Sequence, residues 1–153
     1  MRGRIVVGLD GSSGSKRALA WVIEHLADEE SEVIAVHVMR PFGEFVLDVP
    51  GSGLDNWREN IGWQLRHVWA RPLTEAGIRH RCRMAEGNPA TALAAVADLE
   101  RAEVIVVGAT GHGGFVERVF GGVSFRLPHL AHQPVLVAPA PTPAHEAAPA
   151  AAV

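Results

Sequence analysis

Glycines cluster between residues 104 and 124, the stretch of the sequence with the clearest potential for chemistry. An apolar, β-branched run at 104–107 ends in Gly108, and a helical pattern opens at Val123 and Ser124. Between them, glycines recur at positions 111, 113, 114, 121 and 122. Glycine lets backbone N–H groups approach a ligand closely, and the dipole at a helix N-terminus favours negative charge. A buried strand, a glycine-rich loop and a helix N-terminus in this order predict a site for a phosphate-sized anion.

A second glycine turn follows the first apolar run, at residues 5–9. Asp10 and Gly11 end this run, and Ser12 and Ser13 are candidates for the N-cap of the helix that follows. An aspartate at the end of a strand often caps the next turn, and it can equally face a ligand. Taken alone, this turn leaves both roles of Asp10 open.

Apolar runs and helical patterns alternate along the chain and must position these turns. Strands are predicted at residues 5–9, 33–38, 78–84, 104–107 and 133–138, and helices at about 12–28, 55–77, 88–101 and 122–131. Pro72 is expected to kink or end the second helix, and Gly77 to end it. Five strands that alternate with four helices predict an α/β fold, doubly wound, with a five-stranded, mainly parallel sheet.

The order of the strands follows from the burial that each pattern indicates. Residues 78–84 carry arginines at every second position, 79, 81 and 83, which is typical of a half-exposed edge strand with solvated charges. The first and fourth strands are strongly apolar. These features favour the order 3-2-1-4-5, in which the chain switches direction between strands 1 and 4 and leaves a ligand crevice there. Both glycine turns lie at that crevice, which favours a ligand role for Asp10.

Composition bounds the class of protein. The chain has 153 residues, 48% hydrophobic and 20% charged, and is expected to form one globular domain over residues 1–138. Residues 139–153 are mostly alanine and proline and are expected to form a disordered tail. The net charge of −3 gives no reason to expect nucleic acid or a membrane surface as a partner. No apolar run approaches the roughly 20 residues of a membrane span, so a cytoplasmic location is expected.

Other candidate chemistry carries less weight. The glycine loop matches neither a Walker A sequence nor a dinucleotide-binding fingerprint. His112 and Arg118 lie within the loop and could neutralise phosphate charge. His129 and His132 could share a helix face as metal ligands, but no third ligand is evident. Cys82, the single cysteine, belongs to the inward set of its strand and is expected to be an inert buried thiol.

The chain resembles the UspA-like universal stress protein family over residues 5–138. The nucleotide-binding branch of that family carries Gly-x2-Gly-x9-Gly-Ser/Thr after its fourth strand. Gly108, Gly111 and Gly121 have this spacing, and Gly122 stands where serine or threonine is expected. Further matches are the Val-Gly-Leu-Asp-Gly-Ser segment at 7–12, the Val-His-Val strand end at 36–38, the Gly-x-Pro segment at 87–89 and the Pro-Val-Leu-Val segment at 134–137.

The resemblance implies an adenine nucleotide alpha hydrolase-like fold that binds ATP or a related adenine nucleotide, with Mg²⁺. Main-chain groups of Leu9 and Val38 would face the adenine. Asp10 would lie near the ribose and any phosphate-bound Mg²⁺, a cation that prefers carboxylate and phosphate oxygens. The residues expected to line the ribose and phosphates, partly through backbone N–H groups, are Gly108, Gly111, Gly121, Gly122 and Val123.

Gly122 departs from the family pattern because it has no hydroxyl donor. A neutral hydrogen bond contributes only about 0.5–1.5 kcal/mol net, and the backbone amides remain. Ser124, slightly further along the helix, is a candidate to substitute for the missing hydroxyl, and it could equally bond the backbone as a first-turn serine.

The resemblance also implies a regulatory domain of the stress response, in which bound nucleotide alters the binding of an unknown protein partner. Catalysis is expected to be absent or limited to slow ATP hydrolysis, because no residue stands out as a base. The family pairs its last strand, residues 135–138 here, antiparallel with its copy in a homodimer. The alternative is a homodimeric interaction protein of the family branch that binds no nucleotide.

Overall fold

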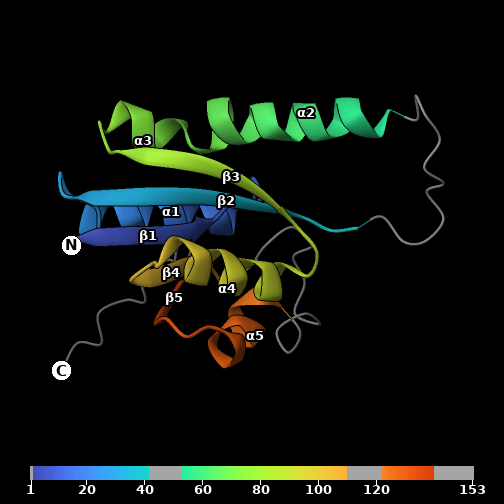
Figure 1. The fold of residues 1–153 in the computed structure, drawn as a ribbon. Helices are drawn as coiled ribbons and strands as arrows, with labels where there is room; N and C mark the ends of the chain where they lie inside the picture. Colours follow the sequence, from blue (N-terminus) through green and yellow to red (C-terminus); the bar gives the residue numbers. More distant parts are fainter. Residues whose placement is uncertain (1, 42–52, 110–121, 140–153) are drawn as a thin grey trace, which may run out of the picture.

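Strands and helices alternate through the part of the chain that the computed structural model describes, residues 2–41, 53–109 and 122–139 (Figure 1). The strands are β1 (Gly3–Gly8), β2 (Ser31–Met39), β3 (His80–Glu86), β4 (Val104–Gly108) and β5 (Val135–Ala138). The helices are α1 (Ser13–His25), α2 (Leu54–Gln64), the π-helical turn η1 (Leu65–Trp69), α3 (Arg71–Glu75), α4 (Pro89–Glu100) and α5 (Val123–Leu130).

The five strands form one parallel sheet in the order β3-β2-β1-β4-β5. β1 lies in the middle and pairs with both β2 and β4, so that Val6 lies between Ile34 and Ile105. β3 pairs with β2 at one edge of the sheet, and β5 pairs with β4 at the other. The α/β, doubly wound fold and the strand order predicted from the sequence are confirmed.

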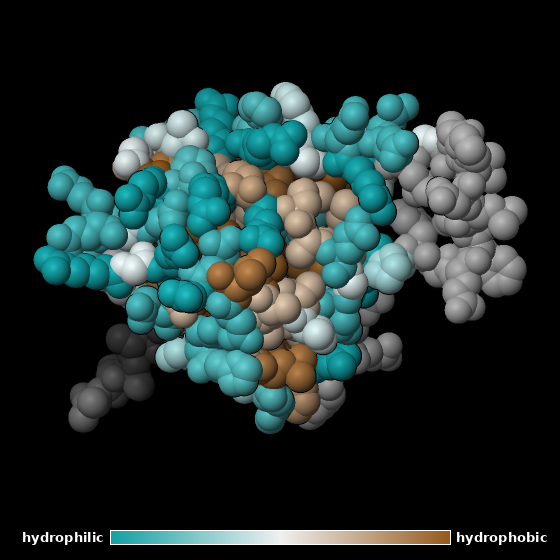
Figure 2. Space-filling view, in the orientation of Figure 1, coloured by the Kyte–Doolittle hydropathy of each residue, from teal (hydrophilic) through white to brown (hydrophobic). Residues whose placement is uncertain are grey.

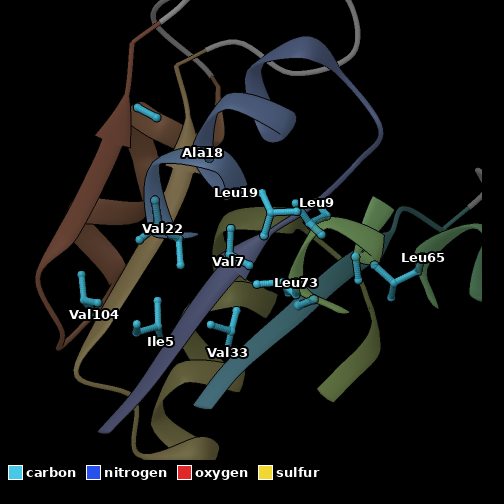
Figure 3. Close-up of a cluster of buried hydrophobic side chains, with 14 residues drawn as sticks. Ile5, Val7, Leu9, Ala18, Leu19, Val22, Val33, Leu65, Leu73 and Val104 are labelled. Atoms are coloured by element: carbon cyan, nitrogen blue, oxygen red, sulfur yellow. The ribbon is translucent and has the colours of Figure 1, made fainter. Parts of the chain in front are cut away.

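Apolar side chains alternate between the two faces of the sheet and fill a core on each. On one face, Ile5, Val7 and Leu9 pack against α1, η1 and α3 (Figure 3). On the other face, Val6 and Ile105 pack against α4 and α5. Ile5, Val6 and Val7 are fully buried, as expected for the central strand of a sheet that helices cover on both sides.

Two helices begin with a side-chain cap, at the residues where the sequence predicts each helix to start. The Ser12 hydroxyl oxygen accepts a hydrogen bond from the Ser15 N–H (3.2 Å) at the start of α1. At the start of α4, Asn88 Oδ1 accepts from the N–H groups of Ala90 (3.1 Å) and Thr91 (3.3 Å). These caps fix where each strand-to-helix turn ends at the carboxyl edge of the sheet.

The helix predicted at 55–77 is interrupted earlier than the sequence indicates. The Ala70 N–H donates to the Leu65 carbonyl (2.9 Å), which closes the π-helical turn η1 between α2 and α3. Pro72 follows in the first turn of α3, where an N–H has no partner within the helix anyway. The interruption therefore precedes Pro72, whereas the sequence predicts it at this proline.

The arginines of edge strand β3 pair with carboxylates. The prediction that they are simply solvated charges at an exposed edge is therefore corrected. Arg81 Nη2 donates to Glu100 Oε2 (2.8 Å), and Arg83 Nη1 donates to the other oxygen of the same carboxylate. Arg81 Nε also donates to Glu32 (3.0 Å). Glu100 is only 6% exposed on α4, and chiefly the hydrogen bond from Arg81 lowers the pKa of this carboxyl, against the opposing effect of burial. This charge network ties β3 to α4.

Apolar side chains also reach the surface over α4 and α5 (Figure 2). Leu99 on α4 is 67% exposed, and Phe125 and Leu130 on α5 are exposed as well. None of the described helices, however, combines the length and the apolar character that crossing a membrane requires.

Candidate functional site

The carboxyl ends of β1 and β4 lie side by side, and the N-terminus of α1 lies against them. A Cβ atom added to Gly108 at the end of β4 would lie 2.4 Å from the carbonyl carbon of Gly14 in the first turn of α1. At the end of β1, the Leu9 N–H donates to the Val36 carbonyl (2.8 Å). The two predicted turns therefore leave neighbouring strands at one edge of the sheet.

Asp10 organises the turn between β1 and α1. Its Oδ1 accepts hydrogen bonds from the N–H (2.9 Å) and the hydroxyl of Ser12. Gly11, between them, has φ of +78°, in the left-handed region that favours glycine. Asp10 thus has the turn-capping role, and its half-buried carboxylate lies at the edge where a ligand is predicted. Contact of Asp10 with a nucleotide or with Mg²⁺ stays a prediction.

The main chain of β2 extends beyond the end of β1. The Leu9 carbonyl accepts a hydrogen bond from His37 Nδ1 (2.7 Å), and the Leu9 side chain is buried. The register of β1 with β2 ends at the pair of Gly8 and Val36. Because alternate residues of a strand direct their polar groups to the same side, the N–H and carbonyl of Val38 point past the end of β1, like those of Val36. This is where the predicted site places the adenine.

Two residues outside the predicted site, His37 and Trp69, support the Asp10 turn. Their ring centroids lie 5.1 Å apart at an interplanar angle of 56°. The Trp69 indole also lies against Gly11, where an added Cβ atom would come within 2.8 Å of the ring. Trp69 is the last residue of η1, and π-helical turns occur frequently at functional sites. The sequence carries no local signal for this contact.

The N-terminus of α5 adjoins the end of β4. Gly122 is the N-cap of α5, with φ of −74° and no side-chain cap. The Ser124 hydroxyl donates to the carbonyl of Ala109, the residue that follows β4 (3.2 Å). Ser124 therefore ties α5 to β4 rather than bonding within its own first turn. The first N–H groups of an α-helix have no partner within the helix, so those of Val123 and Ser124 are suited to an anion.

Part of the predicted site lies outside the described residues. This holds for Gly111 and Gly121, and for the two loop residues that could neutralise phosphate charge, His112 and Arg118. Their roles stay predictions.

A cavity of about 420 Å³ opens beside the N-terminus of α5. Its lining comes from the end of β2, the turn between β3 and α4, and the first turns of α4 and α5: Arg40, Pro41, Gly87, Asn88, Pro89, Ala90, Val123 and Arg126. Its volume falls within the range of small-molecule sites, roughly 300–1,000 Å³. Val123 thus belongs both to the predicted phosphate site and to this cavity.

The remaining candidates of the sequence have structural partners. His132 Nδ1 contacts the Asp98 carboxylate (3.1 Å), and the His129 ring lies against Phe125, with centroids 5.6 Å apart. Within the described residues, no three metal-ligating side chains gather at one point. Burial raises the pKa of the Cys82 thiol, as expected for an unreactive cysteine.

Comparison with known proteins identifies relatives over almost the entire chain. The model of the universal stress protein family matches residues 1–139. Universal stress protein MJ0531 of Methanocaldococcus jannaschii is 29% identical over 144 residues, covering 90% of this chain and 82% of that protein. Universal stress protein YxiE of Bacillus subtilis is 26% identical, covering 90% and 99%.

Solved structures share the fold. Hypothetical protein MJ0577 superposes with a TM-score of 0.74 at 22% identity, covering 89% of this chain and 94% of its own. A universal stress protein in complex with cAMP has a TM-score of 0.65 at 23% identity, covering 91% and 98%. The Arabidopsis thaliana protein At3g01520, with AMP bound, has a TM-score of 0.63 at 16% identity, covering 90% and 91%.

Proposed function

The chain belongs to the universal stress protein family, and on that premise we propose that it binds an adenine nucleotide at the carboxyl edge of its sheet. The observation that carries the proposal is the junction of β1, β4 and α1 at Gly108, with the N-terminus of α5 tied to the same strand end by Ser124. Ligands of open α/β sheets bind at this kind of crevice. The cAMP and AMP complexes of two relatives of the same fold support an adenine ligand.

Each part of the edge suits one part of an adenine nucleotide. The main chain of Val38, directed past the end of β1, would meet the adenine. The N–H groups of Val123 and Ser124 would donate to phosphate oxygens. Asp10 would lie near the ribose and a phosphate-bound Mg²⁺. One carboxylate together with phosphates and water fits Mg²⁺, which prefers oxygen ligands and keeps part of its hydration; it would neutralise phosphate charge there.

The proposed ligand is ATP with Mg²⁺, and the proposed role is regulatory. The site draws on β1, β2, β4 and α5, so a bound nucleotide would fix these elements relative to one another. A protein partner that contacts this edge would then respond to the nucleotide, which is the role in the stress response that we propose. Gly122 lacks the hydroxyl that serine or threonine would offer to the phosphates, and this lowers the expected affinity. The missing neutral hydrogen bond would contribute about 0.5–1.5 kcal/mol.

We expect calorimetric titration with ATP and Mg²⁺ to give saturable heat, and excess nucleotide to raise the melting temperature. Asp10→Asn keeps an oxygen that accepts from Ser12 but removes the charge. It should weaken Mg²⁺–ATP binding by about tenfold, because hydrogen bonds and contacts to charged groups are stronger than neutral ones. Glu103→Gln is the matched control. Glu103 precedes β4 at the amino-terminal ends of the strands, so the substitution should leave the affinity for Mg²⁺–ATP unchanged.

Absence of both heat and thermal shift at millimolar nucleotide would contradict the proposal. That result would instead support the alternative, an interaction protein of the same family that binds no nucleotide. The specific feature in its favour is Gly122, which supplies no hydroxyl at the start of α5.

We also propose a homodimer formed through β5. This strand lies at the edge of the sheet, and its Val137 side chain is 38% exposed. An apolar edge strand invites pairing with another strand. Light scattering should give the mass of a dimer, and Val137→Lys should shift it toward the monomer. Val68→Lys, at a comparably exposed valine of η1, should leave the dimer intact; a monomeric wild type refutes the proposal.

A further inference from the structure

The cavity beside α5 has a positively charged lining. Arg40 follows β2, and Arg126 lies one turn into α5. The other six lining residues are uncharged. Val123 and Arg126 are three residues apart on α5 and therefore share one face of the helix, the face that lines the cavity.

The side chains of both cavity arginines lack a polar partner among the described residues. Arg40 and Arg126 make no side-chain hydrogen bond or ion pair with a described residue. By contrast, Arg81 and Arg83 on β3 both form ion pairs with Glu100, and Arg81 also pairs with Glu32. Arginine guanidinium groups bind phosphate oxygens through charge-assisted, often bidentate hydrogen bonds. Two guanidinium groups that no described carboxylate pairs with, at one cavity, thus form a site for a ligand with more than one negative charge.

The N-terminus of α4, which also lines the cavity, does not supply the attraction for an anion. Asn88 Oδ1 already accepts from the N–H groups of Ala90 and Thr91, which caps the N-terminus of α4 within the protein. The attraction for an anion therefore comes from the two arginines, together with the N-terminus of α5 at Val123.

We propose that the Arg40–Arg126 cavity binds the phosphate chain of the nucleotide and selects ligands with two or more phosphate groups. The proposal rests on the adenine nucleotide site proposed above, since Val123 is common to both. Arg126 would bind the phosphates next to the N-terminus of α5, and Arg40 would bind them from the end of β2. The expected order of affinity is ATP and ADP, then AMP, then adenosine.

The test is a set of dissociation constants for adenosine, AMP, ADP and ATP with wild type, Arg40→Gln and Arg126→Gln. Each variant should weaken ATP binding by about tenfold, the lower bound for a hydrogen bond to a charged group. Adenosine affinity should change by less than about twofold, because adenosine carries no charge for the arginines to bind. Arg126→Lys should bind ATP more tightly than Arg126→Gln does. Added salt should reduce the difference between the affinities for ATP and for adenosine.

Arg79→Gln is the matched control. Arg79 is exposed and precedes β3, so it lies at the amino-terminal ends of the strands, away from the cavity. The variant should bind all four ligands like the wild type. If Arg40→Gln and Arg126→Gln bind ATP as well as the wild type does, the cavity proposal is overturned while the nucleotide site stands. Equal wild-type affinity for adenosine and ATP overturns it as well. If the wild type binds none of the four ligands, both proposals fall.

Discussion

Replacing Gly108 by alanine is expected to lower the free energy of unfolding by about 3 kcal/mol, the upper end of the usual cost of overpacking. The added methyl carbon would lie 2.4 Å from the carbonyl carbon of Gly14 and 2.5 Å from its oxygen. Both atoms belong to the backbone of α1, so no side-chain rotation relieves the contact. Either α1 or the end of β4 must move, and urea unfolding at equilibrium measures the cost.

Gly8→Ala is the matched control at the end of the neighbouring strand. Its added carbon would lie 3.2 Å from a Leu93 methyl group and 3.3 Å from a Val107 methyl group, both at the ends of side chains that can shift. We expect it to cost less than about 1 kcal/mol. Gly108→Ala should also weaken nucleotide binding, because it displaces the end of β4 or the N-terminus of α1, which both lie at the crevice. Equal stability of the two variants would show that β4 and α1 do not meet as closely as described.

Replacing Trp69 by alanine is expected to cost about 3 kcal/mol, the lower end of the range for removing a large aromatic side chain, because the indole is only half-buried. The ring fills the space between His37 and Gly11, so its loss leaves a hole under the Asp10 turn. The variant should therefore lose nucleotide affinity although Trp69 is placed beneath the turn and not among the predicted ligand contacts. Urea unfolding and ATP titration measure the two effects.

Two variants accompany this one. Trp69→Phe retains an aromatic ring against His37 and should recover most of the stability. Trp63→Ala removes an indole that is 51% exposed and should cost less than about 1 kcal/mol, as surface substitutions usually do. Comparable losses in Trp69→Ala and Trp63→Ala would mean that the turn does not depend on the indole of Trp69.

The strand order could be predicted because its signals are local. Charge at every second position marks β3 as an edge strand, and the continuous apolar runs around Val6 and Ile105 mark strands buried on both faces. Asp10-Gly11 and Gly108 each indicate a turn at the end of such a run. Once the order is known, the geometry of parallel sheets brings these turns to one edge.

The supporting contacts could not be predicted because they join residues that are far apart in the sequence. His37 reaches the Leu9 carbonyl across 28 positions, and Arg83 reaches Glu100 across 17. The sequence shows the arginines of β3 as a regular pattern but does not show which carboxylate they face. In the same way, Arg40 and Arg126 line one cavity because β2 ends where α5 begins, at the carboxyl ends of the strands. The sequence does not show this proximity.

The helix interruption illustrates a further limit. Pro72 is the strongest helix-breaking signal between residues 55 and 77, yet the backbone departs from α-helical geometry before it, at the hydrogen bond from Ala70 to Leu65. Pro72 is tolerated because it falls within the first turn of a new helix. The π-helical turn depends on how Leu65 and Trp69 pack against the sheet, which no local pattern reveals.

The proposed adenine nucleotide binds at the carboxyl ends of the strands, with its phosphates at the N-terminus of α5. Amide chemical shifts in a ¹⁵N-labelled sample titrated with ADP and Mg²⁺ test this placement most directly. We expect the largest shift changes at Asp10, Val123 and Ser124, and none at Ile78 or Glu103, which lie at the other end of the strands. Unchanged amide signals of Val123 and Ser124 at saturating nucleotide would contradict it.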